Sequence, residues 1–194
     1  MGLLRLWWAG VRKPVTAFDL LGTWAAPAWG LAAVFIRYTI TAVLYCLPMY
    51  LMGRHPFLPS RLTFLPSDER YFLAETFFLP FVGLAIFLLG TAVAYVAIRL
   101  TGRRVDYDQI VNIGGLAAIV TVPFVLIWDW VMVLAGGWNV VVAAFSHSGF
   151  LLWGAGLVGT GYRRILGLPA AGAYALALGV AILSGPVLAG LVAR

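Results

Sequence analysis

Cysteine is almost absent from this chain of 194 residues, which contains only Cys46. A single cysteine excludes an intramolecular disulfide and a cysteine-rich metal site. Because Cys46 lies inside an apolar run, we expect it to pack as a small buried hydrophobe. Histidine is nearly as scarce, and His55 and His147 are far apart in the sequence. The sequence therefore predicts neither a metal site nor a bound cofactor.

Charged residues are also few, at 10% of the chain against 63% hydrophobic residues, and the mean hydropathy is +0.98. Soluble domains carry about 25% charged residues, and a soluble chain of this composition would expose far too much apolar surface. We therefore expect a lipid bilayer to be the main solvent. The net charge of +6 comes from basic residues scattered in small groups between apolar runs. That distribution is typical of loops beside anionic headgroups and argues against nucleic acid as a partner.

Two long uncharged runs, residues 76–98 and 109–128, are joined by one short charged turn. About 20 apolar residues cross the roughly 30 Å hydrocarbon layer as a helix, so each run is long enough to span it. Three further apolar segments have a similar length: residues 25–52, 138–162 and 170–193. The sequence predicts an all-α membrane protein in which residues 23–194 form a single domain of five transmembrane helices.

The first 22 residues are amphipathic, with apolar residues alternating with basic ones. The pair Trp7 and Trp8 favours the headgroup level of a bilayer. Residues 1–22 are therefore predicted to form an interfacial amphipathic segment that lies on the membrane. A capping-box pattern at Thr16 and Asp19 predicts that a helix restarts near Thr16.

The segment at 25–52 has two features that complicate a simple crossing. Arg37 divides it, so either the whole segment crosses, or a shorter stretch from Tyr38 to about Pro56 crosses with Arg37 near the headgroups. Pro48 predicts a kink. Residues 53–70 contain three prolines and are predicted to form an irregular loop at the interface.

Basic residues divide unequally between the two predicted membrane faces. The face that carries the N-terminus holds eight of them: Arg5, Arg12, Lys13, Arg99, Arg103, Arg104, Arg163 and Arg164. The opposite face holds four: Arg54, Arg61, Arg70 and Arg194. Because cytoplasmic loops carry the excess of Lys and Arg, we expect a cytoplasmic N-terminus and a C-terminus outside.

Five polar residues fall within or beside the predicted spans: Arg37, Glu75, Asn112, Asp129 and His147. A charge inside the bilayer costs about 2.5–3.5 kcal/mol on insertion scales, so such residues face protein or water. One interpretation is a polar path or a proton relay. The other is that Arg37, Glu75 and Asp129 lie near helix ends and snorkel or pair structurally, while His147 hydrogen-bonds a neighbouring helix.

Two stretches of the sequence match catalytic or cofactor-binding motifs, but their predicted structural context excludes both motifs. Ser146, His147 and Asp129 supply the letters of a hydrolase triad, but adjacent helical residues point about 100° apart and do not face each other as nucleophile and base. Residues 154–159 match the dinucleotide-binding glycine pattern as a string. They lie inside an apolar run, however, instead of between a strand and a soluble helix. We expect no enzymatic activity.

The last predicted helix carries a small residue at every fourth position, a spacing that lets helix backbones approach closely in lipid. The stripe consists of Ala173, Ala177, Ala181, Gly185, Ala189 and Ala193. The charged turn, with Arg103, Arg104, Asp106 and Asp108, is the best predicted docking site for a partner protein. The alternative is that this turn only sets orientation and pairs its own charges.

Several short motifs resemble the Yip1-domain family of membrane proteins. They are Pro14, Ala17 and Phe18, then Trp24, Pro27 and Trp29, then Gly102-Arg103-Arg104, then Asn112-Ile113-Gly114-Gly115-Leu116-Ala117 with Pro123, and finally the stretch from Trp153 to Pro169 before a small-residue helix. The resemblance covers most of residues 14–193 and implies a cytosolic N-terminus, five membrane helices and no catalytic residue. Eukaryotic members act as adaptors in vesicle traffic and Rab GTPase recruitment through a longer N-terminal region. This chain is more similar to the bacterial members, which implies a bacterial cytoplasmic (inner) membrane.

These features favour a non-catalytic membrane protein that organises membrane or serves as an adaptor or accessory subunit. It would act through helix packing and cytoplasmic loops, with other membrane subunits or a second copy as partners. The alternative is a small transporter or channel with a polar path through Arg37, Glu75, Asn112, Asp129 and His147.

Overall fold

The structure is a computed structural model that describes residues 3–24, 26, 28–56 and 68–192. Every regular element in these residues is helical. The elements are α1 (Leu3–Arg12), α2 (Pro14–Trp24), α3 (Trp29–Thr41), a π-helical turn η1 (Ala42–Cys46), α4 (Leu47–Leu51), a 3-10 turn η2 (Asp68–Arg70), α5 (Tyr71–Leu100), α6 (Tyr107–Leu134), α7 (Val140–Ile165) and α8 (Ala170–Val192).

Four helical segments are long and apolar enough to cross a membrane: Trp29–Leu51, Asp68–Leu100, Tyr107–Leu134 and Val140–Ile165. This confirms the predicted all-α membrane class. The fifth predicted crossing falls on α8, whose apolar stretch Ala170–Gly185 is shorter, so a count of five stays a prediction. The shorter first crossing, from Tyr38 to about Pro56, extends past the end of the helix, and the part of this helix that crosses stays a prediction. The helix begins at Trp29, includes Arg37 and ends at Leu51.

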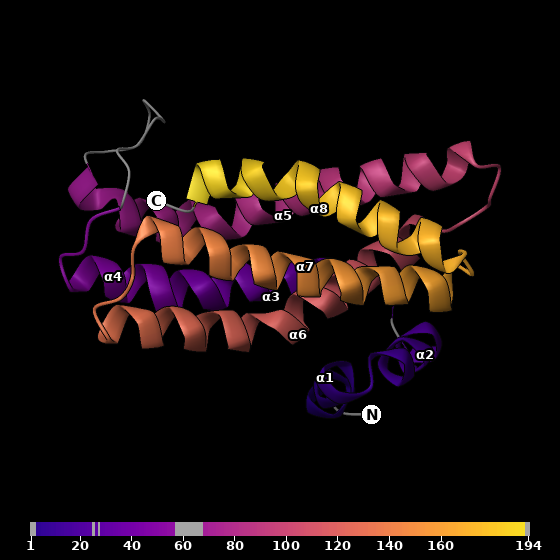
Figure 1. Ribbon diagram of the computed structural model, residues 1–194, viewed down its shortest axis with the longest axis horizontal. Coiled ribbons are helices and arrows are strands. Elements are labelled where there is room, and N and C mark those ends of the chain that lie inside the picture. Colours follow the sequence, from indigo (N-terminus) through magenta and orange to yellow (C-terminus); the bar gives the residue numbers. More distant parts are fainter. Residues whose placement is uncertain (1–2, 25, 27, 57–67, 193–194) are drawn as a thin grey trace.

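The long helices α3, α5, α6, α7 and α8 lie along one common direction (Figure 1). α3 runs parallel to α6, because Gly30 contacts Asn112 and Leu44 contacts Trp130. α6 and α7 are antiparallel, because Phe124 lies beside Trp153 whereas Asp129, later in α6, lies beside His147, earlier in α7. α6 lies at the centre of the bundle, because 61% of the residues in its most apolar stretch are buried, against 6% in the most apolar stretch of α7. The buried residues of α7 are Ala155, Leu157, Gly159, Gly161 and Tyr162, all in its second half.

A close contact between backbones joins α3 to α6 at Gly30 and Gly115. A Cβ atom on Gly115 would lie 2.5 Å from the Gly30 Cα atom, and one on Gly30 would meet the Val111 backbone. Small residues are what allow helices in lipid to pack this closely. Asn112 stabilises the same contact, since its Oδ1 accepts a hydrogen bond from the Gly30 N–H at 2.7 Å.

The π turn and Pro48 interrupt the first long helix without ending it. Pro48 has no N–H, so a carbonyl one turn earlier loses its helical donor. The Leu44 carbonyl, four residues before Pro48, instead accepts a hydrogen bond from the Trp130 indole Nε1 at 2.9 Å. The five residues of η1 immediately precede α4, and π turns of this kind often lie at functional sites. α6 thus supplies the donor that the proline removes.

The N-terminal segment forms two helices that pack against the bundle near the end where α7 ends and α8 begins (Figure 1). The second helix begins at Pro14, two residues before the predicted Thr16, because proline suits the first helical position. Leu6, Phe18 and Leu21 are buried in one cluster with residues of α6 and α7. Trp7 also stacks on Phe124, with ring centroids 6.2 Å apart. The apolar side of this segment thus contacts protein, and its predicted place at the membrane interface stays a prediction.

An exposed ion pair fixes α2 to the end of α7. Arg164 donates from Nε to Asp19 Oδ1 at 3.0 Å and from Nη2 to Oδ2 at 2.9 Å. These hydrogen bonds lower the pKa of Asp19 below its ordinary value of 3.8. The pair therefore contributes above the unfolded pKa and is lost as pH falls through the lower folded value.

We expect α2 to detach from α7 more readily as pH falls below about 4. Proteolysis of the N-terminal segment should accelerate over that range in the wild type. Asp19→Asn should be cleaved faster at pH 7 and respond less to acid. Equal pH dependence in both proteins would contradict the assignment.

Candidate functional site

The bundle buries ionisable side chains at the end opposite α1 and α2. We call Arg37, Tyr45, Glu75, Asp129 and His147 the ionisable cluster. Glu75 on α5 is 2% exposed and Asp129 on α6 is 5% exposed. Acidic residues are almost never buried this deeply unless they are paired, and an ionisable residue inside a membrane helix is a functional candidate by default.

Asp129 and His147 bring α6 and α7 together within this cluster. His147 Nε2 lies 3.6 Å from Asp129 Oδ2. On its other side, His147 Nδ1 lies 3.0 Å from the carbonyl oxygen of Ala143, one turn earlier on α7. The second carboxylate oxygen, Asp129 Oδ1, is buried without a hydrogen-bond partner among the described residues. The carboxyl group is therefore only partly satisfied.

The π turn η1 contributes Tyr45 and Cys46 to the same region. The Tyr45 hydroxyl accepts a hydrogen bond from the Trp138 indole Nε1 at 2.9 Å. Both Asp129 and Glu75 lie close enough to Tyr45 to act on it electrostatically. Glu75 also interacts with the buried Cys46. Tyr45 is thus within electrostatic range of both buried carboxyl groups.

Arg37 of α3 is the basic residue of this cluster. Its guanidinium carbon lies 4.5 Å from the centre of the Tyr38 ring, a cation–π contact. Its Nε is buried without a hydrogen-bond partner in the part of the chain that the structure describes. Arg37 is also near enough to His147 to act on it electrostatically. Among the described residues, Arg37 forms no ion pair with Glu75 or Asp129.

The ionisable cluster lies inside the bundle, close to one of its ends. At 1.5 Å per residue, His147 is about 10 Å from the start of α7, and Asp129 is about 8 Å from the end of α6. Glu75 is one turn after the start of α5. Glu75 and Asp129 therefore lie near helix ends, as one of the two interpretations predicts. Their side chains are buried instead of reaching out to the headgroups.

Asn112 is not part of this cluster. Its Oδ1 accepts from the Gly30 N–H, and its Nδ2 donates to the Ala26 carbonyl at 3.2 Å. These contacts lie at the start of α3, at the other end of the bundle from Asp129 (Figure 1). Asn112 satisfies backbone groups at a helix start, which is a structural role. A path through all five predicted polar residues is therefore not assembled.

The small-residue stripe of α8 packs inside the molecule where its side chains are described. Ala173 and Ala177 are buried in the main core, and Ala181 is half-buried. A Cβ atom on Gly185 would lie 3.0 Å from the Leu151 side chain of α7. The side chain of Ala189 lies outside the described residues. The stripe joins α8 to α5 and α7.

The predicted docking loop is exposed at Arg103, Arg104, Asp106 and Asp108. Arg103 donates from Nη1 to the Gly167 carbonyl at 3.0 Å, which ties the loop to the α7–α8 connection. Within the described ranges, no ion pair joins the charges of this loop to one another. The loop is thus open to a partner at three of its four charged positions.

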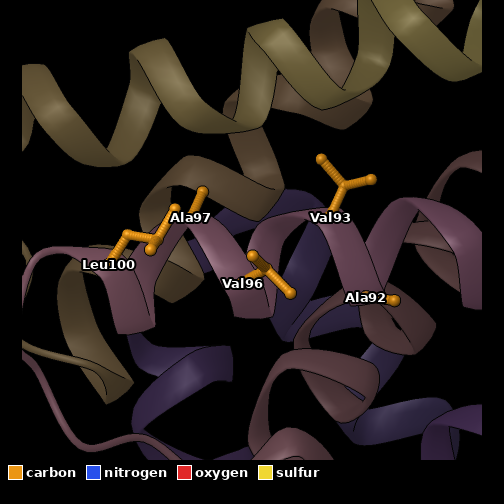
Figure 2. A pocket seen from close by; sticks show the side chains of 5 residues that line it. All are labelled: Ala92, Val93, Val96, Ala97 and Leu100. Carbon is orange, nitrogen blue, oxygen red and sulfur yellow. The ribbon is translucent and has the colours of Figure 1, made fainter.

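Two shallow hollows on the outer surface are almost wholly apolar. One, of about 390 Å³, is lined by Ala92, Val93, Val96, Ala97 and Leu100 of α5, whose side chains Figure 2 shows. The other lies between α5 and α8 beside Gly90 and Val180. Neither hollow contains an ionisable residue, so both suit lipid chains better than a polar solute. Among the described residues, no group of three His, Cys, Asp or Glu side chains is arranged to hold a metal ion.

Sequence reasoning missed Tyr45, Trp130 and Trp138 as members of this region. Pro48 offered one signal, because a proline inside a predicted helix leaves a carbonyl that needs another donor. The pairing of Asp129 with His147 offered another. Both lie nine residues from Trp138, close to the turn between two helices, and an antiparallel hairpin brings such positions together.

Fold and site together define the class: an α-helical membrane protein with an ionisable cluster near one end of its bundle, of which Glu75 and Asp129 are buried. No family model matches the chain, and neither the curated proteins nor the solved structures include a significant match to it.

Proposed function

We propose that this protein is a non-catalytic integral membrane protein that serves as an adaptor or accessory subunit and organises the membrane around it. The observation that carries the proposal is the outward face of α7, which we define as Ala144, Phe145, Ser148, Gly149, Leu152 and Gly156. Residues at these spacings share one side of a helix. All are exposed except the half-buried Gly156.

The glycines of α7 support a partner helix on this face. A side chain added to Gly149 or Gly156 would meet no atom within 4 Å. By contrast, Gly159 and Gly161 of the same helix lie against Tyr174 and Phe18. A mid-helix glycine costs about 0.5–1 kcal/mol relative to alanine, and glycine at a membrane helix surface favours close packing of another helix. The outward face thus has the composition of a helix–helix interface, and no other helix among the described residues covers its two open glycines.

Replacing both Gly149 and Gly156 by leucine should abolish association through this face. The wild type, purified from native membranes in mild detergent, is expected to carry a stoichiometric companion subunit or a second copy, as measured by native mass spectrometry. The double variant should be purified alone. The matched control is Gly179→Leu, at an equally open glycine of α8, and it should retain the companion. Loss in both variants, or in neither, would count against the α7 face.

The proposed placement is a bacterial cytoplasmic membrane with the N-terminus in the cytoplasm. Support comes from the basic residues near α1 and α2, which include Arg5, Arg12 and Lys13, and from the exposed Arg103 and Arg104 at the same end of the bundle. The amphipathic α1 would then face anionic headgroups with its basic side. The short motifs similar to Yip1-domain proteins are consistent with this arrangement.

A transporter is the second candidate, and the ionisable cluster is the observation that favours it. Buried acidic and basic side chains in membrane helices mark ion or proton pathways in many transporters. Flux in liposomes separates the candidates. A carrier should lose solute or ion flux when Asp129 and Glu75 are both neutralised, whereas an adaptor should keep its companion.

A further inference from the structure

The position of one hydrogen on His147 follows from its contact with Ala143. A carbonyl oxygen only accepts hydrogen bonds, so the ring nitrogen 3.0 Å from it, Nδ1, must carry a hydrogen. In a neutral imidazole the other nitrogen, Nε2, then has a lone pair and no hydrogen. Nε2 is the atom that faces Asp129 Oδ2 at 3.6 Å.

This arrangement is repulsive unless one further proton is present. A neutral ring would point its lone pair at a buried carboxylate, leaving a negative charge in a region that desolvates it. A proton on Nε2 gives an imidazolium–carboxylate pair, and a proton on the carboxyl gives a neutral hydrogen-bonded pair. We propose that Asp129 and His147 form a binding site for one proton, which is occupied at neutral pH and joins α6 to α7.

Three neighbouring elements contribute ionisable groups near the pair. α3 contributes Arg37, η1 contributes Tyr45 and Cys46, and α5 contributes Glu75. From α8, Tyr174 bonds Thr160 far along α7 from His147.

His147 is the side from which the proton enters. Its side chain is 42% exposed, whereas that of Asp129 is 7% exposed. The ring also stands between Trp138 and Phe150, with centroids at 5.7 and 6.3 Å, which hold it in place. The carboxyl group thus lies on the inner side and the imidazole on the outer side. This site is independent of the α7 outward face, so either proposal can fail without the other.

Nitrogen NMR of the protein with ¹⁵N-labelled histidine tests the proposal directly. The chain has two histidines, so the exposed His55 serves as an internal reference and His147→Phe assigns the signals. At neutral pH in lipid nanodiscs, His147 is expected to show a hydrogen on Nδ1 in the wild type. Nε2 should then carry a second hydrogen or accept one from Asp129. A wild-type ring with its only hydrogen on Nε2 would overturn the proposal.

Infrared difference spectra locate the proton when it is on the carboxyl group. If the His147 ring is neutral, the wild type should show a carboxylic acid C=O band that is missing from Asp129→Asn. The matched control, Glu75→Gln, removes the neighbouring buried carboxyl and should leave this band and the His147 nitrogen signals unchanged. A neutral ring without such a band would show that the pair holds no proton and would refute the site.

Discussion

An alanine at Gly30 or Gly115 is expected to destabilise the bundle more than any other single methyl group added to the buried helix contacts. The new Cβ atom would meet backbone, not a movable side chain, at 2.5 Å from the Gly30 Cα atom in the case of Gly115. Overpacking of this kind costs about 1–3 kcal/mol and sometimes more, because helices must move apart. Moving α3 from α6 would also lengthen the 2.7 Å bond from the Gly30 N–H to Asn112.

Thermal unfolding in mild detergent measures this effect. Gly30→Ala and Gly115→Ala should both unfold well below the wild type. The matched control is Gly179→Ala on α8, where a Cβ atom meets nothing within 4 Å. That variant should be unchanged or slightly more stable, because alanine is the better helix former by about 1 kcal/mol. Three variants of equal stability would show that α3 and α6 do not pack through these glycines.

The spans were predictable because they depend only on local length and apolarity. The runs at 76–98 and 109–128 fall within α5 and α6, and the predicted 138–162 overlaps α7. Hydrocarbon thickness fixes the minimum length of such a helix whatever its neighbours are. The start of α3 at Trp29 instead of residue 25 is an ordinary uncertainty at a helix end.

The contacts between helices were less predictable, because periodic patterns do not identify the neighbour. The stripe containing Ala177 and Gly185 predicts close packing, and the structure places that packing against α5 and α7 of the same chain. Asn112 and Asp129 are both polar residues of α6, yet one satisfies backbone at Gly30 and the other faces His147. Only the register between helices distinguishes the two roles.

Tyr45 shows why the complete cluster was beyond sequence reasoning. Its position depends on the π turn η1, which changes the face that a residue presents by adding one residue to a helical turn. No composition signal marks such a turn in advance. The Asp129–His147 contact was easier to predict, since both residues lie near the one short connection between the antiparallel helices α6 and α7.

Removing the imidazole of His147 is expected to cost far more than neutralising Asp129, although both changes break the same pair. His147→Phe keeps a ring beside Trp138 and Phe150 but leaves the Asp129 carboxyl buried without its proton partner. Loss of one member of a fully buried ionic pair costs about 3–5 kcal/mol, and because the His147 side chain is 42% exposed, we expect the cost here to lie below that range. Asp129→Asn can donate from its amide to Nε2, so its cost should stay near about 1 kcal/mol.

The double variant decides whether the cost comes from the stranded carboxyl group. If it does, Asp129→Asn in the His147→Phe background should restore most of the lost stability, and the two changes should be strongly non-additive. Thermal unfolding of all four proteins in the same detergent measures the coupling. Simple addition of the two single effects, or equal single effects, would mean that His147 contributes by packing on Trp138 alone. A large rescue would show instead that α6 and α7 are held together by a carboxyl group that requires a proton donor beside it.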